Sequence, residues 1–563
     1  MKNTPSILDK RRAGILLHIT SLPSTLGNGT MGKHAYRFID FLKECGLSLW
    51  QVLPIHPPQR VPLNTPHRDF LSPYQPQSVH AGNPLLINLD KLMKKGWLPK
   101  MVLPTYNRQQ LEQAIDYRYQ CLKNAYSHFD EHANKADHQA YQQFVEENQE
   151  WLEDYALFCA LKDVYQGACW WNWREKGYRY REPQALDKAR KRFADKIEQY
   201  RFIQFAFFRQ WQELQEYAHQ NGVYLFGDMP FFVARDSVEV WANRDNFLLD
   251  EKGNPRYLSG IAPEDDYFHI RKGQCWGHPL YNWDNLQKDD FQWWINRFKI
   301  ANELFDFVRL TYFRGFYECW AIPLNKPSEN GRWRLTPWRK LFDRVTEEEI
   351  MKDNFKKWIA EDVGASRKTI KWRSHNFSGI KIMQLAFNDE SKVPLRNQHL
   401  PHHHKPTDVV YTGTHDSNTT LGWFKWITKT KTKQEYVCEY LDAKPEDFPW
   451  ALIQATLRSV AKLAIIPMQD ILGLDSEHRM NNPGTSNSRN WRWQFEWSQI
   501  SPDKENKLKN WFNAMKEIKK PNIFIVVFLT QMLLWTGMVT TMAETTQTDS
   551  GTTSTETPQE KKK

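Results

Sequence analysis

Phe307-Val-Arg-Leu-Thr-Tyr-Phe-Arg-Gly-Phe316 is an apolar run with polar side chains at alternate positions, closed by a glycine. Because successive side chains of a strand point to opposite faces, we expect Arg309 and Thr311 to point one way and Val308 and Leu310 to pack on the other side. The stretch therefore predicts a buried β-strand that presents polar groups near its carboxyl end.

Other runs along the chain share this character, being short, apolar and ended abruptly by polar residues. They lie at residues 15–18, 49–54, 223–228, 358–361, 380–387, 409–412 and 463–470. Together with 307–311 they make eight runs separated by helical or loop segments, which predicts an α/β fold, a (β/α)8 TIM barrel. In such a barrel, catalytic groups lie at the carboxyl ends of the strands.

The spacing of these runs is uneven, and this predicts where the barrel is enlarged. About 165 residues separate the second run from the third, far more than one crossover needs, and they contain charged, helix-patterned stretches. We therefore expect an inserted helical subdomain at about residues 85–220, within a single decorated barrel over residues 1–515. Residues 57–74 and 259–279, rich in Pro, Gly and Asp, predict long loops on the upper face, where they would shape a cleft.

The carboxyl-terminal end differs from the rest. Within the apolar segment 516–543, residues 523–543 carry no charge, and 21 residues at about 1.5 Å each span roughly 31 Å, enough for a bilayer core. Lys516, Lys519 and Lys520 precede this run and would keep the main body cytoplasmic, so a membrane anchor is one reading. A misplaced signal-like segment is the other, because basic residues, an apolar stretch and small residues follow in that order. Residues 544–563 form a Thr/Ser/Glu/Lys tail that we expect to be disordered.

Composition narrows the possible partners. The 76 Lys and Arg against 66 Asp and Glu give a net charge of +10, but the charges are spread along the chain, so nucleic-acid binding is not indicated. Seven cysteines without a C-x-x-C pair favour a reducing compartment, in keeping with a cytoplasmic location. The 25 Trp, 22 Tyr and 32 Phe suit the flat faces of sugars, although a large core would also use them.

Two motifs are of kinds that bind a cofactor in other proteins, and neither is a strong match. Gly27-Asn-Gly-Thr-Met-Gly32 matches a dinucleotide pattern but does not directly follow a strand, so a Gly-rich substrate loop is favoured. His402-His403-His404 has no second set of metal ligands in the sequence, which favours a solvated loop over a metal site. We expect no metal and no cofactor.

Carboxylates at strand ends give the strongest chemical signal. Glu361 and Asp362 follow one predicted strand, Asp416 follows another, and Asp228 closes a third. Carboxylates gathered at the carboxyl-terminal end of the predicted barrel suit glycosyl chemistry, which needs a proton donor and a charge near the developing oxocarbenium ion. Helix capping would explain any one of them alone.

Several longer motifs resemble a known family, the 4-α-glucanotransferases called amylomaltases or disproportionating enzymes, glycoside hydrolase family 77. The motifs are Ser72-Pro-Tyr-Gln75, Ala81-Gly-Asn-Pro84, Gly227-Asp-Met-Pro230, Asp236-Ser-Val-Glu-Val-Trp241, Gly273-Gln-Cys-Trp-Gly-His-Pro-Leu-Tyr281, Asn330-Gly-Arg-Trp333, Ile359-Ala-Glu-Asp-Val-Gly364, Thr412-Gly-Thr-His-Asp416 and Asn490-Trp-Arg-Trp493. The resemblance runs in the family's order from about Arg12 to about Met515 and does not cover residue 523 onward.

The resemblance implies an enzyme that cuts an α-1,4 bond of a maltooligosaccharide and passes the glycosyl part to another sugar with retention, through a glycosyl-enzyme ester. By matching position, Glu361 would be the acid/base and Asp416 the third carboxylate, which grips sugar hydroxyls. The remaining substrate-binding positions would be those of Tyr74, Asp228, Arg309, His415 and Trp276. Maltooligosaccharides and α-1,4-glucans are thus the expected partners, and residues 523–543 the only expected membrane contact.

One position departs from the family pattern. The family's strand reads Arg-Ile-Asp-His-Phe-Arg-Gly-Phe, whereas here Thr311 stands where the nucleophilic Asp belongs and Tyr312 replaces the His. A neutral hydroxyl needs a base before it can attack, so activity is in doubt. Three accounts remain open: a transferase in which another carboxylate serves, a catalytically silent glucan binder, and a decaying gene copy. Asp306 is too far along the strand to be that carboxylate.

Overall fold

The computed structural model describes residues 10–59, 71–263, 272–348, 357–363, 377–387, 394–429, 431–485 and 487–517. Two compact units make up the chain, Met1–Met515 and Lys516–Lys563, and almost all of the second lies outside the described residues. In the described part, no helix is both long enough and apolar enough to span a bilayer. The apolar run at 523–543 and the tail at 544–563 lie outside it.

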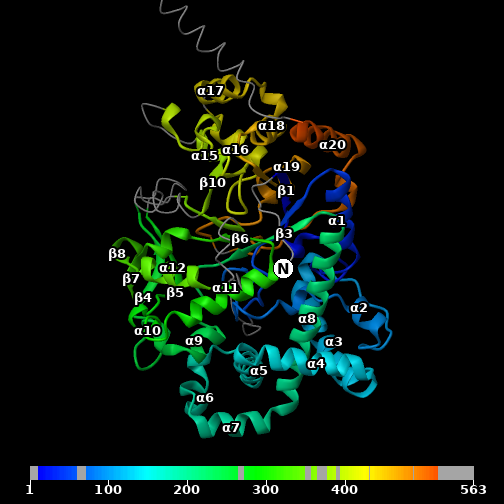
Figure 1. Cartoon of the computed structure of the whole chain (residues 1–563), viewed down its shortest axis with the longest axis vertical. Coiled ribbons are helices and arrows are strands. Elements are labelled where there is room, and N and C mark those ends of the chain that lie inside the picture. The colour runs from blue at the N-terminus through cyan, green and yellow to red at the C-terminus, as the bar shows by residue number, and fades with distance from the viewer. Residues whose placement is uncertain are drawn as a thin grey trace, which may run out of the picture. The chain divides into compact units, whose positions relative to one another are not determined.

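Eight parallel strands close into a barrel, with the spatial order β1-β12-β11-β10-β9-β6-β3-β2. The strands are β1 (Arg12–Leu16), β2 (Leu49–Gln51), β3 (Tyr224–Met229), β6 (Phe307–Leu310), β9 (Trp358–Ala360), β10 (Ser378–Ile382), β11 (Val409–Tyr411) and β12 (Leu463–Pro467). Each coincides with or overlaps one of the predicted runs, so the TIM barrel prediction is confirmed (Figure 1).

Strand β6 is buried along its whole length, as its apolar residues require. Its parallel pairing with β3 sets Asp228 beside Arg309, and its pairing with β9 sets Leu310 beside Ala360. Glu361 follows Ala360 directly. The register of three neighbouring strands therefore brings the polar groups at their carboxyl ends to one place.

Helices surround the barrel and connect its strands. Those before β3 are α1 (Lys33–Glu44), α2 (Leu89–Lys95), α3 (Leu111–His132), α4 (Lys135–Glu147), α5 (Gln149–Val164), α6 (Lys176–Tyr180), α7 (Pro183–Arg192) and α8 (Ala194–Gln220). Those after β3 are α9 (Val238–Ala242), α10 (Trp283–Leu286), α11 (Gln292–Leu304), α12 (Trp338–Glu347), α15 (Met383–Ala386), α16 (Thr420–Ile427), α17 (Lys431–Leu441), α18 (Trp450–Arg458), α19 (Met468–Leu472) and α20 (Pro502–Glu517).

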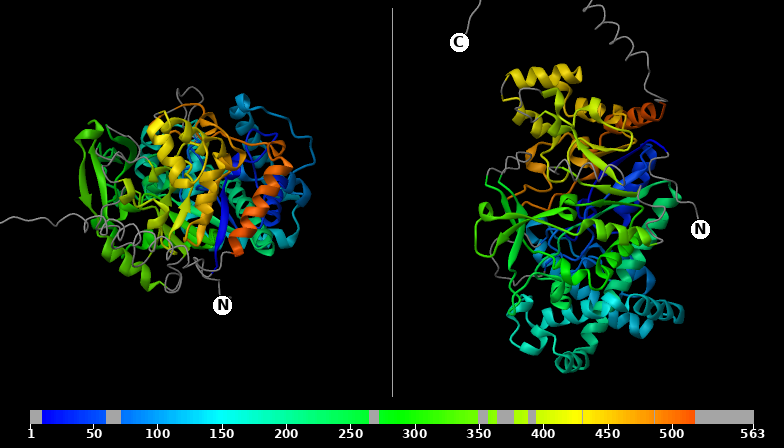
Figure 2. Two further views of the ribbon diagram at one scale, coloured as in Figure 1. Left: turned by 90° about the horizontal axis from the view of Figure 1, so that it is seen from above. Right: turned by 60° about the vertical axis from the view of Figure 1, so that its left-hand side comes forward.

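The long insertion between β2 and β3 is helical, running from α2 to α8. Its aromatic residues pack on one another: Trp97 stacks on Phe205 with ring centroids 5.4 Å apart, and Phe129 lies 4.8 Å from Phe202. Helices α6 and α7 lie at the opposite end of the first unit from α16, α17 and α18 (Figures 1 and 2). That the insertion is a subdomain of its own stays a prediction.

A second sheet lies beside the barrel, and the sequence did not predict it. It is antiparallel, with the order β5-β4-β7-β8, and its strands are β4 (Tyr257–Ile261), β5 (Gln274–Pro279), β7 (Glu318–Pro323) and β8 (Arg332–Leu335). The prediction of a long loop over 259–279 is therefore wrong at both of its ends. Strand β5, Gln-Cys-Trp-Gly-His-Pro, is mostly exposed or half-buried, so it lacks the apolar run that marks a core strand.

Candidate functional site

A cavity of about 370 Å³ opens at the carboxyl ends of the barrel strands. Five predicted site residues line it: Tyr74, Trp276, Thr311, Glu361 and Asp416. They come from distant parts of the chain, and the barrel with its second sheet brings them to one surface. Glu361 and Asp416 thus face a common cavity, as glycosyl chemistry would require.

Arg309 lies behind the cavity, and its side chain is only 2% exposed. Its Nη1 atom donates to Asp228 Oδ2 at 2.6 Å and to Thr311 Oγ1 at 2.9 Å, while Nη2 forms an ion pair with Glu361 Oε1. Burial alone would lower the pKa of Arg309, but the charges of Asp228 and Glu361 raise it well above its ordinary value. One permanently charged guanidinium therefore holds both carboxylates.

Asp228 is fully buried and does not line the cavity. Its Oδ2 accepts from Arg309 and, at 2.8 Å, from the hydroxyl of Tyr74, while its Oδ1 accepts from the hydroxyl of Thr311. Burial, with the negative charge of Asp228 as the next cause, raises the pKa of Tyr74 well above its ordinary value, so this phenol remains a donor. Asp228 is thus the acceptor that fixes Tyr74, Arg309 and Thr311 relative to one another.

The acid/base candidate, Glu361, is oriented by two donors. Besides the ion pair with Arg309, its Oε2 accepts from the backbone N–H of Tyr312 at 2.8 Å. Tyr312 adopts the left-handed conformation, φ 53° and ψ 52°, which is costly for a bulky residue. This turn at the end of β6 points the Tyr312 amide at Glu361.

Asp416 is held by the chain segment that follows α19. Asn481 donates to its Oδ1 at 2.7 Å, and Arg479 donates to its backbone carbonyl at 2.9 Å. Asn481 was not predicted as a site residue, although Met480 to Trp493 belongs to the region of family resemblance. Nothing in the local pattern shows that this segment returns across the barrel to meet Asp416.

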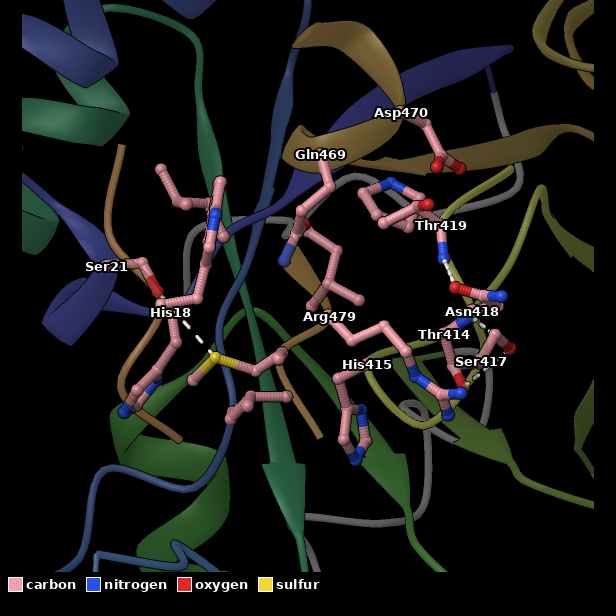
Figure 3. Close-up of a pocket in the computed structure, with 16 residues that line it drawn as sticks. His18, Ser21, Thr414, His415, Ser417, Asn418, Thr419, Gln469, Asp470 and Arg479 are labelled. Atoms are coloured by element: carbon pink, nitrogen blue, oxygen red, sulfur yellow. Dashed lines mark hydrogen bonds between the residues drawn. The ribbon is translucent and has the colours of Figure 1, made fainter. Parts of the chain in front are cut away.

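His415 lies next to the main cavity and not in it. Its ring stacks on Tyr74, with centroids 5.2 Å apart and planes 12° apart. Figure 3 shows His415, His18 and Arg479 among the residues that line a second, much smaller cavity of about 30 Å³. Burial lowers the pKa of His415 although the neighbouring Asp416 acts to raise it, so the imidazole is neutral at pH 7.

Aromatic side chains that the sequence did not assign form much of the cavity wall. Tyr312 meets Trp276 edge to face at 4.9 Å and stacks on Phe232 at 5.7 Å. Trp333 and Trp491 also line the cavity. Trp333 comes from β8, so the wall depends on the second sheet.

Other candidates from the sequence lie elsewhere. Asp362 accepts from the backbone N–H of Ile380, which ties β9 to β10. Asp306 accepts from His219 at 2.9 Å and does not line the cavity. In the triplet of histidines, His404 is buried and bonds Ser459 at 2.7 Å, so the prediction of a solvated loop is wrong for this residue. In the described part of the chain, no group of three His, Cys, Asp or Glu is placed to hold a metal ion.

Comparison with known sequences gives one consistent result. The family model described as 4-alpha-glucanotransferase, glycoside hydrolase family 77, matches residues 17–499. A 4-alpha-glucanotransferase of Synechocystis sp. is 41% identical over 506 residues, which cover 88% of this chain and 96% of the relative. A 4-alpha-glucanotransferase of Thermus thermophilus is 39% identical over 519 residues, covering 90% and 99%.

Solved structures agree with the sequence relatives. An amylomaltase from Streptococcus agalactiae, determined in complex with acarbose, superposes with a TM-score of 0.80 at 31% identity and covers 90% of this chain and 99% of that one. An amylomaltase from Corynebacterium glutamicum superposes with a TM-score of 0.70 at 16% identity, covering 92% and 76%, and supports the fold alone.

Proposed function

Because the chain belongs to the 4-α-glucanotransferase family, glycoside hydrolase family 77, we propose that its main cavity binds α-1,4-glucans and that Thr311 makes glycosyl transfer slow. The observation that carries the proposal is the meeting of Tyr74, Glu361 and Asp416 on one cavity whose nucleophile position holds a neutral hydroxyl. The curated relatives are transferases, and the similar amylomaltase was solved with acarbose, which supports a glucan as the ligand.

Six of the predicted site residues receive a role in this proposal. Tyr74, whose ring is fixed by the stack on His415, provides a flat face for a sugar ring, and Trp276 provides another. Asp416 accepts from sugar hydroxyls, and Glu361 donates a proton to the glycosidic oxygen as the bond breaks. His415 and Arg309 hold these groups in position.

The missing carboxylate determines how far the transfer rate falls below that of an enzyme with Asp at position 311. A unit charge about 3.5 Å from the oxocarbenium centre contributes roughly 5 kcal/mol at an effective dielectric of about 20, or about 10³–10⁴ in rate. If the ester intermediate is lost as well, the rate should fall by a factor that approaches about 10⁶, the scale seen when other enzymes lose a nucleophile. Turnover of maltotriose should therefore be close to absent.

The test compares the protein with its Thr311→Asp variant. Glucose release from maltotriose is measured for both, with Thr311→Asn as a matched control that has the size of Asp without its charge. We expect Thr311→Asp to raise the rate by about 10³ or more and Thr311→Asn to leave it low. A rate for the unmodified protein within about tenfold of the Asp variant would contradict the proposal.

The second candidate function is glucan binding with no turnover at all. The residue at position 311 favours it, because a neutral hydroxyl stands where the family pattern has a nucleophilic carboxylate. In that case maltooligosaccharides raise the melting temperature by mass action and are recovered unchanged. Product analysis after long incubation at high protein concentration distinguishes this from slow transfer.

The cellular location stays a prediction from composition. The cytoplasm suits seven free cysteines, and an anchor at 523–543 would keep the enzyme at a membrane. Fractionation of the full chain and of a chain that stops after Met515 tests this: an anchored protein pellets with membranes and the shortened one does not.

A further inference from the structure

The hydroxyl of Thr311 is hydrogen-bonded in a defined way. Its one hydrogen points to Asp228 Oδ1, and one of its lone pairs accepts from Arg309 Nη1 at 2.9 Å. A hydroxyl oxygen has two lone pairs, so one is left over. Thr311 itself lines the main cavity, where a bound glucan would meet it.

Asp228 cannot act on a glucan directly. Its side chain is fully buried behind Thr311 and Arg309, and it is absent from the cavity lining. Its Oδ2 is occupied by Arg309 and Tyr74, whereas Oδ1 has Thr311 as its partner. Two of its partners, Thr311 and Tyr74, line the cavity, and of these Thr311 stands at the nucleophile position.

This arrangement has the form of an activated nucleophile. A hydroxyl becomes nucleophilic when an adjacent base accepts its proton and a third group orients that base. Here Thr311 is the hydroxyl, Asp228 is the adjacent base, and Arg309 and Tyr74 orient Asp228 through bonds of 2.6 and 2.8 Å. The same constellation would not exist with an Asp at position 311.

We propose that Thr311 accepts a glycosyl group from the bound glucan, with Asp228 as its base, so that the protein becomes glycosylated on Thr311. The proposal rests on the proposed function, because it needs a glucan in the main cavity. Glu361, in its protonated form, donates its proton to the glycosidic oxygen as the bond from that oxygen to C1 breaks, and is left as a carboxylate. A bond forms between Thr311 Oγ1 and C1, and the hydroxyl proton passes to Asp228. The products are a glycosyl-threonine, inverted at C1, and the shortened glucan.

The reverse steps complete a transfer. Asp228 returns its proton to Thr311 Oγ1 as the bond to C1 breaks, and Glu361 takes the proton from the 4-hydroxyl of an acceptor sugar, which then attacks C1. The two inversions together give retention. A threonine oxygen is a far poorer leaving group than the carboxylate of the family's ester, so the second step is slow. The glycosyl-threonine should therefore accumulate.

Intact-protein mass spectrometry after incubation with maltotriose tests the proposal. We expect a mass increase by whole hexose units, located at Thr311 by peptide fragmentation. Thr311→Val, which has the same shape without a hydroxyl, should show no increase, and Thr311→Ser should retain it. Asp228→Asn should slow the modification by about 10²–10⁴, the usual contribution of a general base.

The outcomes separate this inference from the proposed function. If calorimetry shows that maltotriose binds but no hexose adduct forms at Thr311, the inference is overturned and the proposed function stands. An adduct that forms equally fast in Asp228→Asn also overturns the inference. If that variant does not fold, the comparison of Thr311→Val with Thr311→Ser decides whether the hydroxyl of residue 311 carries the adduct. Absence of maltotriose binding overturns both.

Discussion

The ring of Tyr74 lies parallel to the imidazole of His415, with centroids 5.2 Å apart, while its hydroxyl donates to Asp228 at 2.8 Å. Two neighbours thus fix the ring, one through its face and one through its edge. Its position is set before any sugar binds.

Substitutions of Tyr74 separate these two contacts. Tyr74→Phe keeps the stacked ring and removes the hydrogen bond, so maltooligosaccharide affinity should change by less than about threefold. Tyr74→Ala removes the flat surface and should weaken affinity by about tenfold or more, the scale of a lost aromatic contact. Calorimetry measures both; equal losses in the two variants would mean that the hydroxyl, and not the ring, binds the sugar.

Glu361 is predicted to be the proton donor of any transfer. In a Thr311→Asp background, Glu361→Gln should lower the transfer rate by about 10²–10⁴, because an amide cannot supply the proton. The same change at the exposed Glu477 serves as the control and should leave the rate unaltered. Glucose release from maltotriose is the measurement, and a fall of less than about tenfold in Glu361→Gln would assign the proton to another group.

The ion pair between Lys162 and Asp236 should contribute strongly to stability. The two groups lie 2.6 Å apart, and the Lys162 side chain is only 1% exposed. Lys162→Met leaves a buried carboxylate without its cation and should lower the free energy of unfolding by about 3–5 kcal/mol. Lys431→Met breaks the exposed pair with Glu435 and should cost about 0.5 kcal/mol or less. Urea denaturation compares them, and similar losses in both would contradict the prediction.

Buried histidines should make the protein sensitive to acid. Burial lowers the pKa of His56 to about 4, and the same cause lowers the pKa of His278 to about 4. An unfolded histidine takes up its proton near pH 6.5, so between about pH 6.5 and 4 the unfolded state binds protons that the folded state does not. Stability is therefore complete above about pH 6.5 and falls with pH through that window.

Substitution of His56 measures how much this one histidine contributes to the loss of unfolding free energy at low pH. Between pH 7.5 and 5, His56→Gln should lose about 2 kcal/mol less of its unfolding free energy than the unmodified protein. Urea denaturation at the two pH values gives the difference. Equal losses in both proteins would show that His56 is protonated in the folded state as readily as in the unfolded one.

The sequence predicted the barrel because its strands are short apolar runs that end at polar residues, a pattern that depends on local chemistry alone. The same pattern placed Glu361 and Asp228 at strand ends and singled out Arg309, and family resemblance added Tyr74 and His415. Strand β5 was missed because it is mostly exposed or half-buried and contains glycine and proline. The sequence did not predict Asn481 as a site residue, because its hydrogen bond to Asp416 joins residues 65 positions apart and no local pattern carries that information.

Position 311 also sets how much charge surrounds Arg309. The guanidinium already contacts Asp228 and Glu361, and the hydroxyl of Thr311 meets Asp228 without adding a charge. An acid at this position would place like charges side by side in a buried centre, where repulsion is strong. Faster turnover and resistance to heat are therefore opposed at this one residue. The Thr311→Asp variant, which should regain catalysis, should melt at a lower temperature than the unmodified protein.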